Sequence, residues 1–460
     1  MPYFALAVST LALGSAAGLA RHVALEGALR YPLGGWGAPL GIDLYVDGLA
    51  ALALLMTGVV NWFIGLYATA YFADDRAGRY FWPLWLFLSG ALNALFVSAD
   101  LFNLYVTLEL VGLASVALAA LSGKGPALVA SMRYLLVTLL GSLLYLMAVA
   151  LLYAAYGALD IATVGARLQN EPVAWVAFAL ITVGMWLKIA LFPLHFWLPP
   201  AHANAPGPVS ALLSGLVVKA GFYLLLRFWI MLFPDTFDPR AGHVLGAFGV
   251  AAIIWGSLHA LRQRRLKLLV AYSTVAQMGY LFLLFPLSFT VQGASAWSGV
   301  VLYMLAHAGA KAAMFMAASN LLLAYGHDRI DGLSGSAHIM PVTLFAFGLS
   351  GVTLMGLPPS GGFVAKWLLL SAAVEAQMWF YVGAIVLGGL LAAAYVFRVL
   401  RSASRIVPST AAGTLAVRRL PRRLEWAPLV LAAVAAALGF YAVLPLELLE
   451  EAAPFTEVAP

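Results

Sequence analysis

The sequence predicts an all-α polytopic membrane protein, and three observations support this fold class. Of the 460 residues, 63% are hydrophobic and only 10% are charged, whereas a soluble protein carries about 25% charged residues. Apolar runs of about 18 residues or more, the length of a bilayer-spanning helix, recur from one end of the chain to the other. Short alternating segments, which a transmembrane β-barrel requires, do not occur.

We expect about 13 transmembrane helices, and the ends of each are predicted to within a few residues. They are predicted at 3–20, 48–71, 80–98, 101–121, 134–156, 174–194, 209–232, 244–260, 268–286, 297–323, 341–376, 380–400 and 427–445. The eleventh is too long for one straight crossing and contains "GLPPSGG" (356–362), so we expect one span broken in its middle. The first lacks a preceding basic region, which favours a retained span over a cleaved signal.

The basic residues between these spans predict the orientation of the chain. One set of alternate loops contains sixteen, namely Arg76, Arg79, Lys124, Arg133, Arg262, Arg264, Arg265, Lys267, Arg329, Arg398, Arg401, Arg405, Arg418, Arg419, Arg422 and Arg423. The other set contains five, namely Arg21, Arg30, Arg167, Arg227 and Arg240. The positive-inside rule then places the first face in the cytoplasm, with the N-terminus, and places the acidic C-terminal tail outside.

The remaining four basic residues are all lysines inside predicted spans: Lys188, Lys219, Lys311 and Lys366. A charged lysine at the bilayer centre costs about 2.5–3.5 kcal/mol, and desolvation penalises its charged form. Such a lysine can therefore exchange a proton, which an arginine cannot do because it stays charged. The pattern favours proton exchange over fixed charge. The structural alternative is that Lys188 or Lys366 extends its amine to the membrane surface.

Two further groups fit the same chemistry. Glu109 is the only acidic residue well inside the spans of the first half, and we expect it to pair with Lys188, because a lone buried carboxylate is paired or protonated. The alternative is a neutral carboxyl bonded to a backbone carbonyl. His307 and Lys311 are spaced i, i+4 on one helix face, which suggests two stations of a proton path. A histidine that is simply packed inside the helix bundle is the alternative for His307.

The composition excludes several other chemistries. The chain has no cysteine, so thiolate-held iron–sulfur clusters and disulfides are excluded. Phosphate-loop and dinucleotide fingerprints do not occur, and the net charge of +6 resides in loops rather than in a nucleic-acid-binding surface. The histidines are scattered, so we expect no metal site and no cofactor. His195 and His202 flank "FWLPP" and line either a water-filled break or an interfacial loop.

Proline-rich breaks suggest an internal repeat. "FPLHFWLPP" follows Lys188 and "GLPPSGG" precedes Lys366, and discontinuous helices at matching places in two halves point to an ion site in transporters. Spans three to seven and eight to twelve form two sets of five, and an odd number inverts the second set. We therefore expect N-terminal helices at 1–79, inverted repeats at 80–232 and 244–400, and a basic loop, last helix and acidic tail at 401–460. Gln277 holds the place in the second set that Glu109 holds in the first.

Four stretches resemble a known family. They are "DLFNLYVTLE" (100–109), "LKIALFPLHFWLPPAHANAPGPVSALLSGLVVKAGFYLLLRF" (187–228), "LKLLVAYSTVAQMGY" (266–280) and "GLPPSGGFVAKW" (356–367). Together they resemble the antiporter-like subunits of respiratory complex I, membrane-bound hydrogenases and Mrp cation/proton antiporters. "GGWGAPLGIDLYVDGLAAL" (34–52) and the first stretch look most like the Mrp D-type subunit.

The resemblance implies two inverted five-helix repeats, each with a broken helix, and a relay across the membrane middle. The family's positions match Glu109, Lys188, Lys219, His307, Lys311 and Lys366. It implies no redox centre, other membrane subunits as partners, and a multi-pass location in a bacterial or archaeal-type inner membrane. Two features depart from the pattern. Typical members have fourteen spans, so we expect this chain to lack one N-terminal helix, and Gln277 stands where some relatives carry histidine.

Three functions remain open at this point. The chain is an ion-translocating subunit of a multi-subunit complex, either an Mrp-type antiporter exchanging protons for Na⁺ or K⁺ or a redox-driven proton pump. Alternatively, it is the proton-conducting membrane partner of a soluble or redox enzyme module, with no chemistry of its own. A purely structural subunit is the third possibility. The loop 401–425, with six arginines, fits an ordinary positive-inside loop, with anionic lipid headgroups or a cytoplasmic partner as alternatives.

Overall fold

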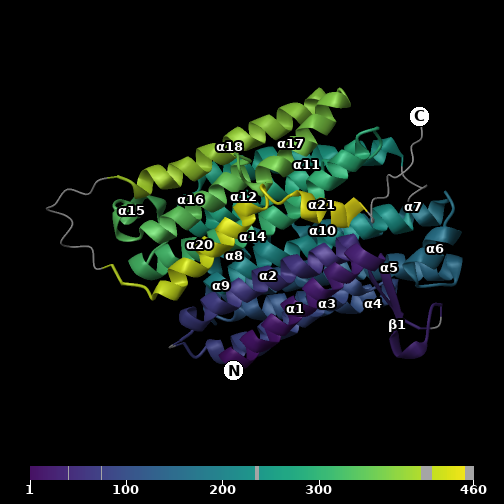
Figure 1. Ribbon diagram of the computed structural model, residues 1–460, viewed down its shortest axis with the longest axis horizontal. Helices are drawn as coiled ribbons and strands as arrows, with labels where there is room; N and C mark the ends of the chain where they lie inside the picture. Colours follow the sequence, from purple (N-terminus) through teal and green to yellow (C-terminus); the bar gives the residue numbers. More distant parts are fainter. Residues whose placement is uncertain (40, 74, 234–237, 406–416, 451–460) are drawn as a thin grey trace.

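The computed structural model describes residues 1–460 apart from 40, 74, 234–237, 406–416 and 451–460. It is a bundle of long helices that run roughly along one common direction (Figure 1). Within the described residues, eleven helices are long and apolar enough to cross a membrane. They are α1 (Pro2–Glu26), α2 (Gly48–Tyr71), α3 (Gly78–Val97), α4 (Leu101–Ala120), α5 (Gly125–Tyr156), α7 (Pro172–Ile189), the composite Gly207–Arg227, α11 (Pro239–Arg262), the composite Leu266–Leu287, α14 (Gly293–Tyr325) and α18 (Trp379–Ala403).

Shorter elements complete the bundle. Gly207–Arg227 consists of α9 (Gly207–Leu212), the π-helical turn η2 (Leu213–Val217) and α10 (Val218–Arg227), followed by η3 (Phe228–Leu232). Leu266–Leu287 consists of α12 (Leu266–Leu281) and α13 (Leu284–Leu287). The others are α6 (Ile161–Arg167), α8 (Leu198–Asn204), η4 (Ile330–Leu333), α15 (Ser336–Ile339), α16 (Pro341–Met355), α17 (Gly361–Glu375), α20 (Arg422–Ala437) and α21 (Val443–Glu450).

The predicted all-α membrane fold is therefore confirmed. The predicted span 341–376 is broken as expected, into α16 and α17, whereas the predicted span 427–445 is made of parts of two helices shorter than a full crossing, α20 and α21. α5 starts nine residues before the predicted 134, at Gly125, because Pro126 occupies the first turn of the helix, where proline is tolerated.

α14 lies at the centre of the bundle. Its most apolar stretch is wholly buried, whereas the corresponding stretch of α1 is mostly exposed. α14 packs against α2, α12, α16, α17 and α20, so segments from both halves of the sequence meet on it. A polar side chain on the inner faces of α14 is consequently shielded from both lipid and water by protein.

Both predicted helix breaks are present. α7 ends where Ala190 adopts a left-handed conformation at φ 57°, and an irregular stretch leads to α8. The indole of Trp197 donates to the carbonyl of Leu187 at 2.9 Å, which satisfies one of the carbonyls that the end of α7 leaves free. α16 ends at Met355 and is followed by Gly356 at φ 80°, and α17 is preceded by its N-cap Ser360, whose hydroxyl accepts from the amide of Phe363. Such breaks are tolerated at membrane depth because protein groups replace the missing partners.

A small polar assembly lies at the end of the bundle that carries the hairpin of β1 (Leu29–Pro32) and β2 (Asp43–Val46) (Figure 1). The strands pair antiparallel, with Arg30 opposite Tyr45. The Arg30 guanidinium donates to Asp43 and to Asp160, both at 2.6 Å. Asp160 also caps α6, so the hairpin is tied to the segment between α5 and α7.

Candidate functional site

Lys188 lies in the last turn of α7, next to the first break, and is only 8% exposed. Its Nζ donates to the hydroxyl of Thr138 on α5 at 2.9 Å and lies 3.9 Å from Oε1 of Glu109 on α4. The second distance is an ion-pair separation and is too long for a direct hydrogen bond. Oε1 of Glu109 is buried and has no hydrogen-bond partner in the structure. Three helices thus converge on one amine.

Close helix packing sets this geometry. Gly184 on α7 faces Gly141 on α5, and a Cβ built on Gly184 would lie 2.6 Å from the carbonyl oxygen of Gly141. A Cβ on Gly141 would lie 3.4 Å from Cγ of Lys188. Since only glycine allows two helix backbones to approach so closely, this pair brings Thr138 within reach of the lysine.

A cavity of about 20 Å³ adjoins Lys188 and is lined by Tyr134, Thr138 and Gly221, among others. One water needs about 10–15 Å³ and two or more polar partners. The cavity is therefore large enough for a single water beside the amine. α10 forms part of its wall through Ala220 and Gly221, which follow Lys219 in the chain.

Lys219 is fully buried in α10, directly after the π-helical turn η2. A π-helical turn widens the backbone and disturbs its regular hydrogen-bond pattern. The Nζ of Lys219 donates to the Ser214 carbonyl within that turn. The Ser214 hydroxyl lies 2.9 Å from the Thr274 hydroxyl of α12. Through this hydroxyl contact, the irregular turn of the first set of helices is hydrogen-bonded to α12 of the second set.

His307 and Lys311 lie on α14 and are both 0% exposed. Nζ of Lys311 donates to the Val270 carbonyl at 2.9 Å and to the Ser273 hydroxyl, both on α12. His307 stacks on Tyr303, with ring centroids 5.7 Å apart, and neither of its ring nitrogens has a hydrogen-bond partner. His307 precedes Lys311 by one helical turn, and the Tyr303 ring that it stacks on also lies 5.4 Å from the Lys366 amine. His307 therefore lies close to two of the four lysines, Lys311 on its own helix and Lys366 on the other side of Tyr303.

Lys366 lies on α17, after the second break, and is 6% exposed. Its Nζ donates to the Leu354 carbonyl in the last turn of α16 at 2.7 Å. The same amine lies 4.0 Å from the ring centroid of Tyr280 and 5.4 Å from that of Tyr303. Two aromatic faces and a free helix-end carbonyl thus compensate a lysine that has no carboxylate among its described partners.

Gln277 on α12 is held by two tyrosines. The Tyr303 hydroxyl donates to its Oε1, and its Nε2 donates to the Tyr395 hydroxyl at 2.9 Å. Its side-chain oxygen and nitrogen both have partners inside the protein. Gln277 orients Tyr303, which in turn touches both His307 and Lys366.

The two histidines of the first break lie in different surroundings. His202 on α8 is 0% exposed and stacks on Phe315 of α14 at 4.6 Å, with neither ring nitrogen bonded. His195 lies in the irregular stretch before α8 and faces Phe192, Tyr272 and His259 instead. The structure thus brings His202 to α14, the helix that carries Lys311, and places His195 beside Tyr272 of α12.

Two basic residues that we assigned to loops are buried, and those assignments were wrong. Lys267 is 1% exposed in the first turn of α12, and its Nζ donates to the Ala205 carbonyl between α8 and α9. Arg227 is 6% exposed at the end of α10, where it makes a bidentate ion pair with Asp47, the N-cap of α2. The available signal was position, since the predicted span 268–286 began one residue after Lys267 and the span 209–232 already included Arg227.

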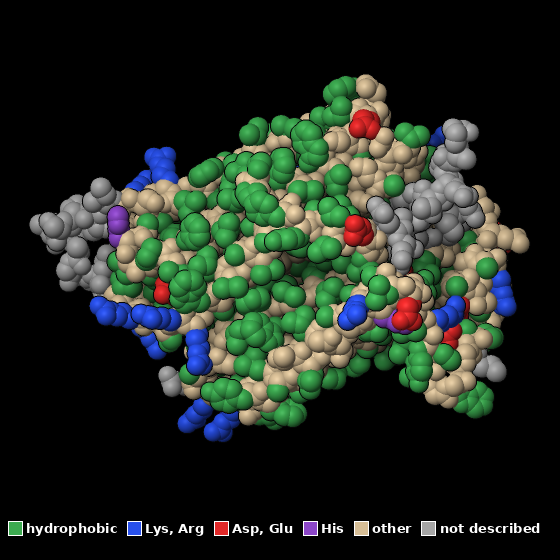
Figure 2. All heavy atoms as spheres, viewed as in Figure 1, with side chains coloured by type: hydrophobic (Ala, Val, Ile, Leu, Met, Phe, Trp, Pro, Cys, Tyr) green, Lys and Arg blue, Asp and Glu red, His purple; other side chains and the backbone are tan. Residues whose placement is uncertain are grey.

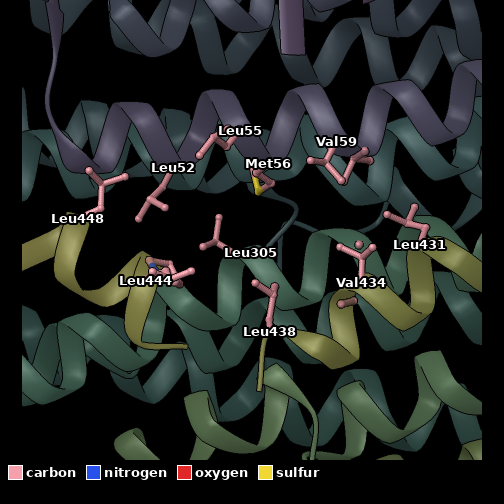
Figure 3. A pocket seen from close by; sticks show the side chains of 14 residues that line it. Leu52, Leu55, Met56, Val59, Leu305, Leu431, Val434, Leu438, Leu444 and Leu448 are labelled. Carbon is pink, nitrogen blue, oxygen red and sulfur yellow. The ribbon is translucent and has the colours of Figure 1, made fainter. Parts of the chain in front are cut away.

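The apolar crevice in Figure 3 does not belong to this site. Its volume is about 350 Å³, and it lies between α2, α14, α20 and α21. α14 contributes Leu305 and Gly309, each two residues before His307 or Lys311. Two residues turn a helix by roughly 200°, so the crevice and the titratable pair lie on opposite faces of α14. Within the described ranges, no three His, Asp or Glu residues are grouped closely enough to hold a metal.

Two family models match the chain. The one described as "NADH:quinone oxidoreductase/Mrp antiporter, TM" matches residues 98–392, more than half of the chain. The one described as "NADH-Ubiquinone oxidoreductase (complex I), chain 5 N-terminus" matches residues 37–81. The first match contains Glu109, His307 and all four central lysines.

Individual relatives and solved structures agree with these matches. NADH-quinone oxidoreductase subunit N of Desulforudis audaxviator is 36% identical over 87% of this chain and 80% of the relative. The D-type Na(+)/H(+) antiporter subunit of Alkalihalophilus pseudofirmus is 29% identical over 81% of this chain and 75% of the relative. A chain of the Mrp complex from a Dietzia species superposes with a TM-score of 0.89 at 27% identity, covering 98% of this chain and 91% of that one.

Proposed function

Since the chain belongs to the NADH:quinone oxidoreductase/Mrp antiporter family of membrane subunits, we propose that it translocates protons within a multi-subunit membrane complex. The residues that carry protons are Glu109, Lys188, Lys219, His307, Lys311 and Lys366. The observation that carries the proposal is the burial of all four lysines, each with an identified hydrogen-bond acceptor.

The partners of these amines suit proton exchange. Backbone carbonyls and hydroxyls accept hydrogen bonds from an ammonium, and only Lys188 has a carboxylate within ion-pair distance among the described residues. A full counter-charge would hold each lysine permanently charged, whereas a neutral acceptor leaves the charged form poorly compensated. Each amine can therefore lose its proton at moderate cost.

Water completes the path between the stations. Both ring nitrogens of His202 and of His307, and Oε1 of Glu109, are buried without a protein partner. Buried polar atoms in native proteins are nearly always satisfied, by water where protein does not serve. We infer that waters at these atoms link the Glu109 pair to the central station at His307, with His202 and Gln277 lining the route.

The orientation follows from the basic loops. Lys and Arg side chains gather at the end of the bundle where α18 ends (Figure 2). We propose that this end faces the cytoplasm, that the N-terminus lies on the same side and that the C-terminus lies outside, in a bacterial or archaeal-type inner membrane. We also propose that the regions 80–232 and 244–400 are inverted repeats, each containing one break, with 1–79 before them and 401–460 after them.

The test is proton uptake by vesicles that carry the assembled native complex with Lys311→Ala. We expect uptake to fall to background while the complex still assembles, because the central station is lost. Lys124→Ala is the matched control, since Lys124 is an exposed lysine ahead of α5. Wild-type uptake in the Lys311→Ala complex would overturn the proposal.

A second candidate is proton conduction coupled to a redox module. Two comparisons favour it: the 36% identity to a subunit of an NADH-quinone oxidoreductase, and a TM-score of 0.86 to a chain of the membrane-bound sulfane sulfur reductase, an archaeal respiratory complex. The antiporter candidate, exchanging protons for Na⁺ or K⁺, is favoured by the Mrp relatives. Identifying the chains that copurify with this protein separates the two.

A further inference from the structure

A second cleft lies at the end of α18, away from the buried lysines. Its volume is about 610 Å³, and it is lined by α18, by the residues that follow α18, and by η4. Arg398, Arg401 and Arg405 contribute three guanidinium groups, while Ala394 and Phe397 contribute apolar surface. We propose that this cleft binds the phosphate headgroup of an anionic phospholipid from the surrounding bilayer.

The cleft has an apolar part and a positively charged part, which match the acyl chain and the phosphate headgroup of a lipid. Positions 394, 397, 398 and 401 recur at helical spacing and share one face of α18, and Arg405 follows two residues after the helix ends at Ala403. Ala394 and Arg401 are separated by roughly 10 Å along the axis at 1.5 Å per residue. Ala394 and Phe397, the latter 55% exposed, therefore precede Arg401 and Arg405 along the helix and lie farther from its end, with Arg398 at the junction of the apolar and charged parts. An acyl chain fits against the first part and a phosphate fits against the second.

The charges in the cleft remain largely uncompensated. Within the described chain, none of the three arginines has a carboxylate within ion-pair distance. Asp331 also lines the cleft and offsets one charge. From Ser402 to Leu424 the sequence contains no Asp or Glu and four further arginines. The C-terminus of α18 adds only about half a negative charge, so the cleft remains strongly positive and suited to phosphate.

Hydrogen bonds hold the walls in place. Arg398 donates to the Leu261 carbonyl at the end of α11, and the Ser402 hydroxyl donates to the Ile330 carbonyl of η4 at 2.7 Å. The amide of Gly335 donates to the Arg405 carbonyl at 2.9 Å. Because three separate segments are bonded to this end of α18, the arginines project from a fixed frame. Ordering costs on binding are accordingly small.

An acidic protein segment is the competing occupant, and the apolar wall argues against it. Ala394, Phe397 and Leu400 belong to a membrane-spanning helix, so the groove continues into the region that lipid chains occupy. The inference does not depend on proton transport. It also holds whichever face of the membrane this end occupies, because the chemistry of the cleft is the same.

The test titrates the purified full-length protein in detergent with short-chain phosphatidylglycerol, phosphatidylcholine or inorganic phosphate. We expect phosphatidylglycerol to bind preferentially. The triple substitution Arg398→Gln, Arg401→Gln, Arg405→Gln should weaken that binding by roughly 10²-fold. Each arginine that is lost should lower the affinity for the anionic lipid by roughly fivefold. The matched control is Arg418→Gln, Arg419→Gln, Arg423→Gln, which removes equal charge outside the cleft and should keep wild-type affinity.

Several results would overturn the inference. Equal loss in both triple variants would mean diffuse charge attraction rather than a site. Inorganic phosphate binding as tightly as phosphatidylglycerol would mean an anion site without a lipid chain. Unchanged binding in the cleft variant, with its melting temperature also unchanged, would exclude the cleft. A Phe397→Asp variant provides a second readout, since it spares the arginines and should still weaken phosphatidylglycerol binding.

Discussion

Nζ of Lys188 lies 3.9 Å from Oε1 of Glu109 and 2.9 Å from the hydroxyl of Thr138. The amine is hydrogen-bonded to the neutral group and only in electrostatic contact with the charged one. This arrangement lets the ion pair shorten or lengthen without breaking the lysine's hydrogen bond. The pair is consequently suited to switching with proton occupancy.

Glu109→Gln and Lys188→Ala should each abolish coupled transport in the assembled complex. Removing a positioned acid–base group typically costs 10²–10⁴-fold, so we expect proton uptake to fall by roughly 10²-fold or more. Dye-monitored uptake in vesicles measures the loss, with complex assembly followed on native gels. Wild-type flux in either variant would exclude the pair from the path.

Gly184→Ala should displace α7 from α5. The added Cβ would lie 2.6 Å from the Gly141 carbonyl oxygen, and overpacking of this kind costs about 1–3 kcal/mol. We expect a lower melting temperature and weaker transport, because Thr138 moves away from Lys188. Gly90→Ala on α3 is the control, since nothing lies within 4 Å of a Cβ there. Equal melting temperatures for the two variants would contradict the close crossing.

Tyr280→Leu should impair transport while Tyr280→Phe should not. The Tyr280 ring centroid lies 4.0 Å from the Lys366 amine, and a desolvated cation–π contact is worth about 2 kcal/mol. Phenylalanine keeps the aromatic face, whereas leucine removes it. Proton uptake and its pH profile, measured for both variants, test the contact. Equal defects in the two variants would point instead to the hydroxyl, which donates to the Ile385 carbonyl at 3.4 Å.

Lys267→Gln should destabilise the junction between α8 and α9. The amine satisfies the Ala205 carbonyl inside the protein, and an unsatisfied buried polar group costs about 1–3 kcal/mol. We expect a reduced melting temperature in detergent. Lys124→Gln, which changes an exposed lysine, should leave it unaltered. A Lys267→Gln protein as stable as the Lys124→Gln control would show that the contact contributes nothing.

Asp47→Asn should be strongly destabilising at neutral pH. Burial alone raises the pKa of the Asp47 carboxyl, but the charge and hydrogen bonds of Arg227 outweigh burial and hold that pKa below its usual value. A depressed carboxyl pKa stabilises the fold above the unfolded value, about 3.9, and this stabilisation is lost as pH falls through the folded value. Between about pH 6 and 8 the Asp47 carboxyl stays ionised, so this pair should cause little change in the melting temperature of the wild type.

Removing one partner of a buried ion pair costs about 3–5 kcal/mol, whereas replacing both with apolar residues is often tolerated. Asp47→Asn should therefore melt well below wild type, and Asp47→Leu with Arg227→Met should recover part of the loss. Thermal melting of the three proteins in detergent at one pH measures this. If the double variant melted lower than Asp47→Asn, the uncompensated charge of Arg227 would not be the cause.

The sequence by itself determined the membrane class, the approximate spans, both helix breaks and the four central lysines. The length of an apolar run, the position of a proline and the position of a charge can all be read from a short stretch of sequence. In a bilayer, an apolar run of sufficient length forms a spanning helix, and a backbone group that a proline frees must find a partner inside the protein. Counting residues sufficed for Lys219 and Lys311 because each falls midway along an apolar stretch.

Apart from the expected pairing of Glu109 with Lys188, only the tertiary structure decided which groups meet. Arg227 and Asp47 are 180 residues apart in the sequence, and Lys267 was separated from a predicted span by a single residue. Whether such a cation is solvated or buried depends on the helices that pack over it, and packing is a property of distant segments. The same holds for the apolar crevice opposite His307 and for the arginine cleft on α18, since α2, α20 and η4 supply walls that no local pattern encodes.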